Sequence, residues 1–156
     1  MHTYEEIEHL VEKYKSAAFF TGGVCESKIK DAQQQLGVSF PEQYKWFLSK
    51  YGHGGVNGSW IEGIGKSSEY PVVEQTKSIR KYSRKNLNNQ WVIIYDVDEY
   101  YYCLSCEDGK VRDWDLSGKT YYEIDSFLDF LYTIIMESVD NDGNIYRDEW
   151  KKIALK

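Results

Sequence analysis

Apolar residues in the first third of the chain recur at helical spacing, and three helices are predicted from them. The first runs from residue 3 to about residue 16, because Thr3 and Glu6 have the spacing of a capping box. The second runs from about residue 26 to Leu36, and Gly37 ends it. The third is predicted from one continuous apolar face, which consists of Phe40, Tyr44, Phe47, Leu48 and Tyr51.

The third helix is marked at both ends and is followed by a glycine-rich segment. Pro41 suits the first helical turn, and Gly52 suits a left-handed C-terminal cap. Residues 53–58, with the sequence HGGVNG, are too rich in glycine for a helix or strand, so they predict a loop whose backbone approaches another group closely. A short strand is predicted after it, from Ser59 to Ile64. One side of that strand would carry Trp60, Glu62 and Ile64.

Three aromatic and β-branched runs, separated by acidic or Asp-Gly turns, predict an antiparallel meander over residues 91–95, 100–106 and 111–116. A two-residue turn at Asp108-Gly109 would place Asp113 opposite Leu104, whereas a three-residue loop that starts at Glu107 keeps the parity. We predict the second register. One face then carries Tyr102, Leu104, Trp114 and Leu116 toward the core. The other face carries Tyr101, Cys103, Ser105, Asp113 and Asp115.

Two further helices and a short C-terminal one are predicted from the same periodicity. A helix from about Val72 would bury Thr76 and Ile79 and turn a basic face outward. A long apolar helix is predicted after Asp125, its N-cap, and it should cover the sheet. Residues 146–156 predict a short packing helix. The basic face consists of Lys77, Arg80, Lys81, Arg84 and Lys85.

These elements predict an α+β fold in which a mostly antiparallel sheet is flanked by N-terminal helices and a C-terminal helix. At 156 residues the chain fits one domain, with a core over residues 3–139 and a C-terminal extension over residues 140–156. Three cysteines, no signal-peptide pattern and no apolar run of membrane-spanning length lead us to expect a reduced, cytoplasmic protein without membrane contact.

Charge and aromatic content bear on the partner. The net charge of −6 argues against general affinity for nucleic acid and favours a basic partner, although solubility explains an acidic chain equally well. Fourteen Tyr, five Trp and six Phe suit either an interface or an aromatic core. The basic face at 77–85 is either solvated or binds phosphate.

No pattern predicts a catalytic residue, a metal site or a cofactor. The pair Cys103 and Cys106 has the CxxC spacing, but in a strand the two sulfurs point to opposite faces and further zinc ligands are lacking. Asp140, Asp142 and Asn144 alternate like the start of a calcium loop, yet a lysine stands where the bidentate Glu is required. His53 in the glycine loop is the one acid/base candidate, and a turn role explains it as well.

The order of these motifs resembles the SUKH family, also described as SMI/KNR-like. The resemblance is carried by residues 29–37, Phe40-Pro41, Tyr44, Phe47-Leu48, Gly54-Gly55, the strands of residues 96–116 with Asp108-Gly109 and Trp114-Asp115, and the apolar positions Phe127, Leu128 and Leu131. It covers about three quarters of the chain, although Phe40 stands where the family commonly has leucine. The resemblance implies an α+β fold, no enzymatic activity, and immunity through binding of a cognate toxin, often a secreted nuclease of polymorphic or LXG type.

The toxin-binding hypothesis rests on an acidic, tyrosine-bearing face. A nuclease is basic where it holds phosphate, so carboxylates can steer it while aromatic side chains anchor it. The candidate residues are Trp60, Asp96, Asp98, Glu99, Tyr100, Tyr101, Asp113 and Asp115, with His53 and Asn57 from the glycine loop. The partner is then a basic toxin domain rather than nucleic acid, bound by a monomer or weak homodimer.

Two other interpretations stay open. A nucleic-acid-binding or regulatory module would use the basic face, and its binding would weaken steeply with salt. A hydrolase would use His53 and would lose turnover in His53→Ala. Immunity instead predicts that affinity for the toxin is lost when Asp113 and Asp115 are replaced by Lys.

Overall fold

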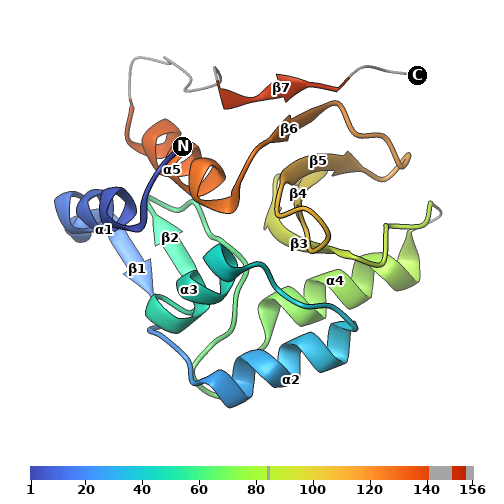
Figure 1. Cartoon of the computed structure of the whole chain (residues 1–156), viewed down its shortest axis with the longest axis horizontal. Helices are drawn as coiled ribbons and strands as arrows, with labels where there is room; N and C mark the ends of the chain where they lie inside the picture. The colour runs from blue at the N-terminus through green and yellow to red at the C-terminus, as the bar shows by residue number, and fades with distance from the viewer. Residues whose placement is uncertain (84, 141–148, 154–156) are drawn as a thin grey trace.

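The N-terminal half of the protein is helical in the computed structural model, which describes residues 1–83, 85–140 and 149–153 (Figure 1). Helices α1 (Tyr4–Lys13), α2 (Glu26–Leu36) and α3 (Glu42–Lys50) confirm the three predicted helices. Thr3 caps α1, since its hydroxyl accepts a hydrogen bond of 3.2 Å from the backbone N–H of Glu6. Gly37 follows α2 with φ of 68°, the left-handed conformation predicted for a C-cap.

Within the glycine-rich segment of residues 53–58, Gly54–Val56 form a strand, so the prediction of a loop is wrong for these three residues. A short 3₁₀-helix (Lys15–Ala17) leads into β1 (Ala18–Phe20), which pairs antiparallel with β2 (Gly54–Val56). A Cβ atom on Gly54 would lie 2.1 Å from the carbonyl oxygen of Phe19, and one on Gly55 would lie 1.7 Å from that of Ser59. The glycines therefore allow the predicted close approach, and what the backbone approaches is more backbone.

The strand predicted over residues 59–64 is also absent. Ile61 forms only an isolated antiparallel bridge with Gly54. Burial alternates from Ser59 to Gly63, but Ile64 is fully buried although it has the parity of Trp60, which is 45% exposed, so the predicted alternation ends before Ile64.

A five-stranded antiparallel sheet forms the C-terminal half, in the order β3-β4-β5-β6-β7. The predicted meander is confirmed as β3 (Trp91–Asp96), β4 (Tyr100–Ser105) and β5 (Val111–Asp115). Two strands of this sheet were not predicted, β6 (Tyr122–Ile124) and β7 (Lys151–Lys152). The predicted C-terminal helix is wrong where residues are described, because β7 extends the sheet there; Tyr146 and Ala154 lie outside the described residues.

The predicted register between β4 and β5 is wrong. Tyr102 pairs with Asp113 and Tyr100 with Asp115, while Tyr101 pairs with Trp114. The hairpin closes on Ser105, whose N–H donates to the carbonyl of Lys110, so four residues form the loop instead of three. That extra residue exchanges the faces, because side chains alternate along a strand. The two aspartates therefore share a face with Tyr100 and Tyr102.

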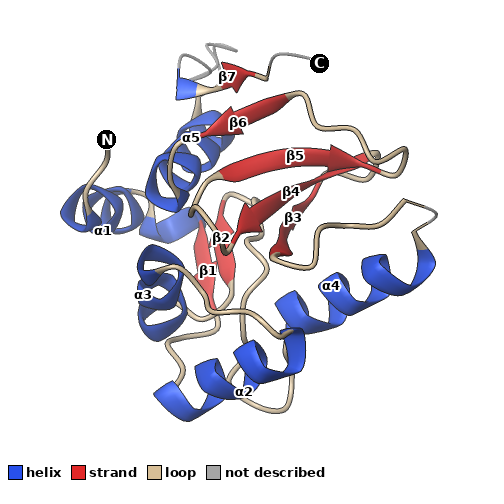
Figure 2. Cartoon of the chain, turned by 45° about the vertical axis from the view of Figure 1, so that its right-hand side comes forward, coloured by secondary structure: helices blue, strands red, loops and turns tan. Residues whose placement is uncertain are grey.

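Both faces of the sheet are packed. Helix α5 (Phe127–Val139) covers one face, as predicted, and its Phe130 contacts Tyr102. The other face holds Tyr101 and Trp114 against α4 (Pro71–Tyr82), which confirms the predicted helix there (Figure 2). Ser126, not Asp125, is the N-cap of α5, because the hydroxyl of Ser126 accepts from the N–H of Asp129.

Candidate functional site

Two hollows lie on either side of the turn between β3 and β4. The tyrosine hollow, of about 430 Å³, is lined by Glu99, Tyr100, Tyr102, Asp113, Trp114, Asp115, Lys119, Tyr121, Tyr122, Glu137 and Trp150. The Trp60 hollow, of about 400 Å³, is lined by His53, Gly58, Trp60, Glu62, Pro71, Tyr95, Asp96 and Asp98. Both lie in the size range of small-ligand pockets, roughly 300 to 1,000 Å³.

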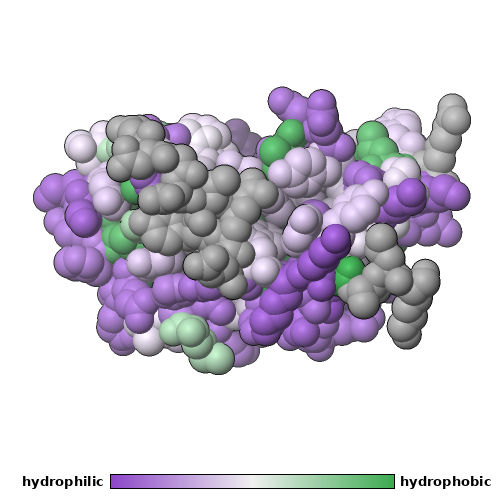
Figure 3. Space-filling model, turned by 90° about the horizontal axis from the view of Figure 1, so that it is seen from above, coloured by the Kyte–Doolittle hydropathy of each residue, from purple (hydrophilic) through white to green (hydrophobic). Residues whose placement is uncertain are grey.

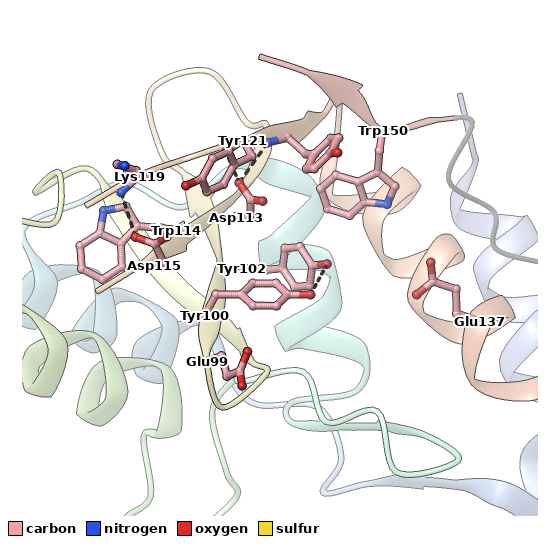
Figure 4. A pocket seen from close by; sticks show the side chains of 11 residues that line it. Glu99, Tyr100, Tyr102, Asp113, Trp114, Asp115, Lys119, Tyr121, Glu137 and Trp150 are labelled. Carbon is pink, nitrogen blue, oxygen red and sulfur yellow. Dashed lines mark hydrogen bonds between the residues drawn. The ribbon is translucent and has the colours of Figure 1, made fainter. Parts of the chain in front are cut away.

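Aromatic rings from separate elements form the walls of the tyrosine hollow (Figure 4). Tyr100 and Tyr102 project from the same face of β4, with ring centroids 5.4 Å apart and planes at 83°. The indole of Trp150, which precedes β7, packs on Tyr102 at 5.1 Å. Tyr121 and Tyr122 at the start of β6 remain 37% and 43% exposed. The hollow thus presents π surfaces that are only partly used by the fold.

Carboxylates surround these rings, and two of them shape the loop between β5 and β6. Oδ1 of Asp113 accepts hydrogen bonds from the N–H groups of Tyr121 at 2.7 Å and Tyr122 at 3.0 Å. Oδ1 of Asp115 accepts from the hydroxyl and N–H of Ser117, and these bonds lower the pKa of Asp115. Both aspartates therefore hold the loop with one oxygen and stay available to a ligand with the other.

The turn between the hollows is an acidic ridge, which we define as Asp96, Asp98 and Glu99. All three side chains are exposed. Oδ1 of Asp96 accepts the N–H of Asp98 at 2.7 Å, and Asp98 adopts a positive φ of 70°. Short polar residues tolerate this left-handed conformation best, so the carboxylates also stabilise the turn that displays them.

In the Trp60 hollow, His53 stacks beside Trp60 with ring centroids 6.1 Å apart. Burial lowers the pKa of His53, and its Nδ1 accepts the N–H of Gly63 at 3.1 Å. A neutral ring that accepts a backbone hydrogen bond in this way is typical of a structural residue in a turn, and His53 fits that role. Trp60 also meets Phe19 edge-on at 5.4 Å, which gives this hollow an exposed aromatic rim.

Glu62 has the most perturbed carboxylate of this hollow. Burial, followed by the negative charges of Asp96 and Glu74, raises its pKa to about 7. Its backbone is fixed on both sides, since its N–H donates to Ile94 and its carbonyl accepts the Tyr44 hydroxyl at 2.7 Å. Strongly shifted carboxylates in clefts are typical of functional sites.

Eight of the ten candidate residues line a hollow. His53, Trp60, Asp96 and Asp98 line one, and Glu99, Tyr100, Asp113 and Asp115 line the other. Tyr101 is 9% exposed and lies on the opposite face of the sheet. It was proposed as a site residue because the predicted register placed it on the same face as Asp113 and Asp115. Asn57 is exposed, and its amide donates to the carbonyl of Ser138.

Several lining residues were missed by the sequence reasoning. They are Glu62, Tyr102, Tyr121, Tyr122, Glu137 and Trp150. The adjacent pair Tyr121-Tyr122 was visible as a signal, because two tyrosines follow a glycine turn there. Glu137 and Trp150 gave no such signal, since only the fold brings α5 and the segment before β7 to the hollow.

Other candidate chemistry is mostly structural. Cys103 is fully buried and burial raises its pKa, while burial raises the pKa of Cys106 to about 12, so both sulfurs stay protonated thiols. Both cysteines are free, and Cys103 is buried with Tyr101 and Trp114 on the face that packs against α4, although the predicted register had turned it away from the core. Asp142 and Asn144 of the calcium-like segment lie outside the described residues.

Tertiary structure also builds an ionic cluster at His2. Its Nδ1 lies 2.6 Å from Glu6, its Nε2 lies 2.5 Å from Glu149, and Asp129 accepts its backbone N–H. Burial opposes protonation of His2, but the hydrogen bonds to the two glutamates outweigh it and raise its pKa. His2, Asp129 and Glu149 are close enough to share a cation, yet both ring nitrogens are already engaged with carboxylates.

The basic face of α4 is partly consumed by the fold. Arg80 donates to the carbonyl of Leu36 at 3.0 Å and to that of Asn89 at 2.8 Å, so it ties the end of α2 to the loop before β3. Lys77, Lys81 and Lys85 are exposed, and Arg84 lies outside the described residues. This face therefore offers fewer free cations than the sequence alone suggests.

A family model described as SMI1-KNR4 cell-wall, SUKH_5, matches residues 5–136, well over half of the chain. The chain belongs to the SUKH family. SUKH proteins are a family of immunity proteins and are generally not enzymes. The matched range of this SUKH chain ends within α5, one residue before Glu137, so Glu137 and Trp150 of the tyrosine hollow lie beyond it. None of the described helices is long and apolar enough to span a bilayer.

Proposed function

We propose that this SUKH protein is an immunity protein that binds a cognate toxin made by the same cell and neutralises it by occlusion. The toxin is a basic nuclease domain of a polymorphic or LXG-type system. Within the family, the order of motifs is especially similar to that of YobK, a bacterial immunity protein. The protein acts by stoichiometric binding, in the cytoplasm, as a monomer or weak homodimer.

The acidic ridge is the observation that carries this proposal. Asp96, Asp98 and Glu99 stand at one exposed turn, and an aromatic hollow lies on each side of it. No salt bridge joins these three carboxylates to a cation among the described residues. A nuclease surface that holds phosphate carries complementary charge.

The acidic ridge and the aromatic hollows contribute to binding in different ways. Carboxylates at an exposed turn raise the association rate by attracting a basic surface over a distance of about one Debye length, roughly 8 Å in physiological salt. Partly exposed aromatic rings in hollows lose water on contact and supply most of the binding energy, as anchors do in other interfaces. Occupation of the nuclease's basic surface would then exclude its nucleic acid substrate.

The side of the molecule that lies uppermost in Figure 1, where β7 forms the edge of the sheet, argues against purely hydrophobic docking. Seen from above, the described part of this face is mostly hydrophilic, with only small, separate apolar areas (Figure 3). Interfaces of this kind depend on a few anchors and on electrostatic matching instead of a broad apolar patch.

The first experiment is co-expression with the product of the neighbouring gene, scored by rescue of growth and by co-purification. A product that is harmless alone and does not bind would remove the main support for immunity. Binding by this protein and rescue of growth together are the expected result.

A second experiment isolates the charge of the ridge. The variant Asp96→Asn, Asp98→Asn, Glu99→Gln removes three charges and keeps the shapes and the turn's hydrogen-bond acceptor. We expect its association rate with the toxin to fall roughly tenfold at low salt, with a smaller difference at high salt. The matched control changes three exposed carboxylates on α1 and α2, namely Glu5→Gln, Glu12→Gln and Glu26→Gln. Equal rates for the two triple variants would contradict the electrostatic part of the proposal.

A further inference from the structure

The tyrosine hollow has the size of a receptor for one side chain. Its volume is about 430 Å³, near the lower end of the range of small-ligand pockets. A helix or strand of a partner is too wide for such a space, whereas a single long side chain fits it. The occupant is therefore a projecting group and not a secondary-structure element.

The carboxylates and aromatic rings that line the tyrosine hollow favour a cation as its ligand. Carboxylates from the β3–β4 turn, β5 and α5 approach the hollow through Glu99, Asp113, Asp115 and Glu137, and Lys119 is the single basic residue among the described residues of the lining (Figure 4). Aromatic faces attract cations through their quadrupoles, most strongly where water is excluded. Carboxylates and tyrosine faces thus act in the same direction.

The geometry favours a planar cation over a compact one. Tyr100 and Tyr102 stand nearly perpendicular at 83°, and Trp150 tilts by 36° from Tyr102, so the rings form the corner of a cage. Each of Asp113 and Asp115 commits its Oδ1 to backbone N–H groups. Among the described residues neither Oδ2 atom has a hydrogen-bond partner. A guanidinium group stacks on aromatic rings and offers five N–H donors to such oxygens, whereas an ammonium group is a point charge.

We propose that the tyrosine hollow binds one arginine side chain of the toxin and that this arginine is the central anchor of the complex. This inference rests on the proposed function and specifies the partner's contact. It also assigns a role to Trp150 and Glu137, which lie beyond the family-matched residues 5–136 and close the hollow. Variation at these two positions would allow one member of the family to select its own toxin.

The hollow is tested without the toxin by a probe, Nα-acetyl-arginine methylamide. Binding is followed by NMR, with the indole N–H of Trp150 as reporter. We expect the chemical shift of the Trp150 indole N–H to change saturably with the arginine probe. The lysine analogue should bind at least roughly fivefold more weakly, and the uncharged citrulline analogue should not bind. An unmoved Trp150 signal, or equal binding of the citrulline analogue, overturns the proposal.

Variants then connect the hollow with the toxin. Tyr121→Ser and Glu99→Gln remove an exposed ring and an exposed charge from the lining, and each should weaken both the probe and the toxin roughly tenfold. The matched controls Tyr82→Ser and Glu107→Gln change an exposed tyrosine and an exposed glutamate outside the hollow, and should change neither affinity.

The outcomes separate the two proposals. If the hollow variants lose the probe but keep full affinity for the toxin, arginine insertion is wrong and immunity stands. If the neighbouring gene's product is neither bound nor neutralised while the probe still binds, the toxin is not the source of the arginine and the proposed function fails. Support requires one toxin arginine whose replacement by lysine weakens binding and is non-additive with Tyr121→Ser.

Discussion

Replacement of Glu62 by glutamine should stabilise the protein above neutral pH. The carboxylate lies in the Trp60 hollow, where burial first, and then Asp96 and Glu74, raise its pKa from 4.5 to about 7. The folded state therefore binds a proton more tightly than the unfolded state does. As pH rises from about 4.5 to about 7, the unfolded chain ionises first, and the free energy of unfolding falls over that window. Above it the loss is complete and constant.

The size of the effect follows from the same shift. At about 1.4 kcal/mol per pH unit, the change from 4.5 to about 7 corresponds to at most roughly 3 kcal/mol. Glu62 keeps some solvent contact, and solvent screening reduces this to about 1 to 2 kcal/mol. For a domain of this size that is a rise in Tm of roughly 2 to 8 °C in Glu62→Gln.

The assay is urea unfolding across this pH window for the parent protein, Glu62→Gln and the control Glu107→Gln, whose carboxylate is exposed in the β4–β5 loop. We expect the parent and Glu62→Gln to converge near about pH 4, below this window, and to separate by about 1 to 2 kcal/mol near about pH 8. A pH-independent difference, or a less stable Glu62→Gln at the higher pH, would refute the reasoning. If the hollow contacts the toxin, the same variant binds it more weakly although it is more stable.

Four further predictions concern the scaffold. Gly55→Ala places a Cβ atom 1.7 Å from a backbone oxygen and should destabilise the protein by about 3 kcal/mol or more. Gly58→Ala meets open space, so only its positive φ of 82° opposes it, and it should cost about 1 to 2 kcal/mol. Thermal unfolding of both variants measures the difference. Thr133→Val should be neutral or stabilising, because the buried hydroxyl has no hydrogen-bond partner among the described residues. Thr76→Val should cost roughly 1 to 3 kcal/mol in urea unfolding, because its hydroxyl accepts a hydrogen bond of 2.9 Å from the backbone of β3. Asp115→Ala should cost about 0.5 to 2 kcal/mol, since this carboxylate caps the β5–β6 loop, and equal stability of the variant would show that the loop holds itself.

The helices were predictable because their signals are local. Periodic apolar positions, a capping hydroxyl at Thr3 and a glycine stop at Gly37 all act within a few residues of the chain. The N-cap of α5 was misplaced by one residue, because Asp125 and Ser126 are both good caps. In the fold the hydroxyl of Ser126 accepts the N–H of Asp129, while Asp125 pairs with the distant Lys151.

The strands were less predictable because pairing is not local. Asp108-Gly109 fits turns of several lengths, and the packing of Trp114 against α4 excludes the predicted three-residue loop, which would turn Trp114 to the opposite face. The glycines of β2 misled the prediction in another way, because they indicated a loop where the fold has a strand. Glycine normally weakens a strand, but here the neighbouring backbone is too close for any Cβ atom.

For this protein, sequence by itself determined the α+β class, the helices, the meander and the acidic, aromatic character of the β3–β4 region, since each depends on composition or short-range periodicity. Tertiary structure decided which side chains meet. The tyrosine hollow joins residues from Glu99 to Trp150, and the His2 cluster joins both ends of the described chain. The physical reason is that a binding site needs convergence in space, and convergence is fixed by strand register and by the packing of α4 and α5 on opposite faces of one sheet.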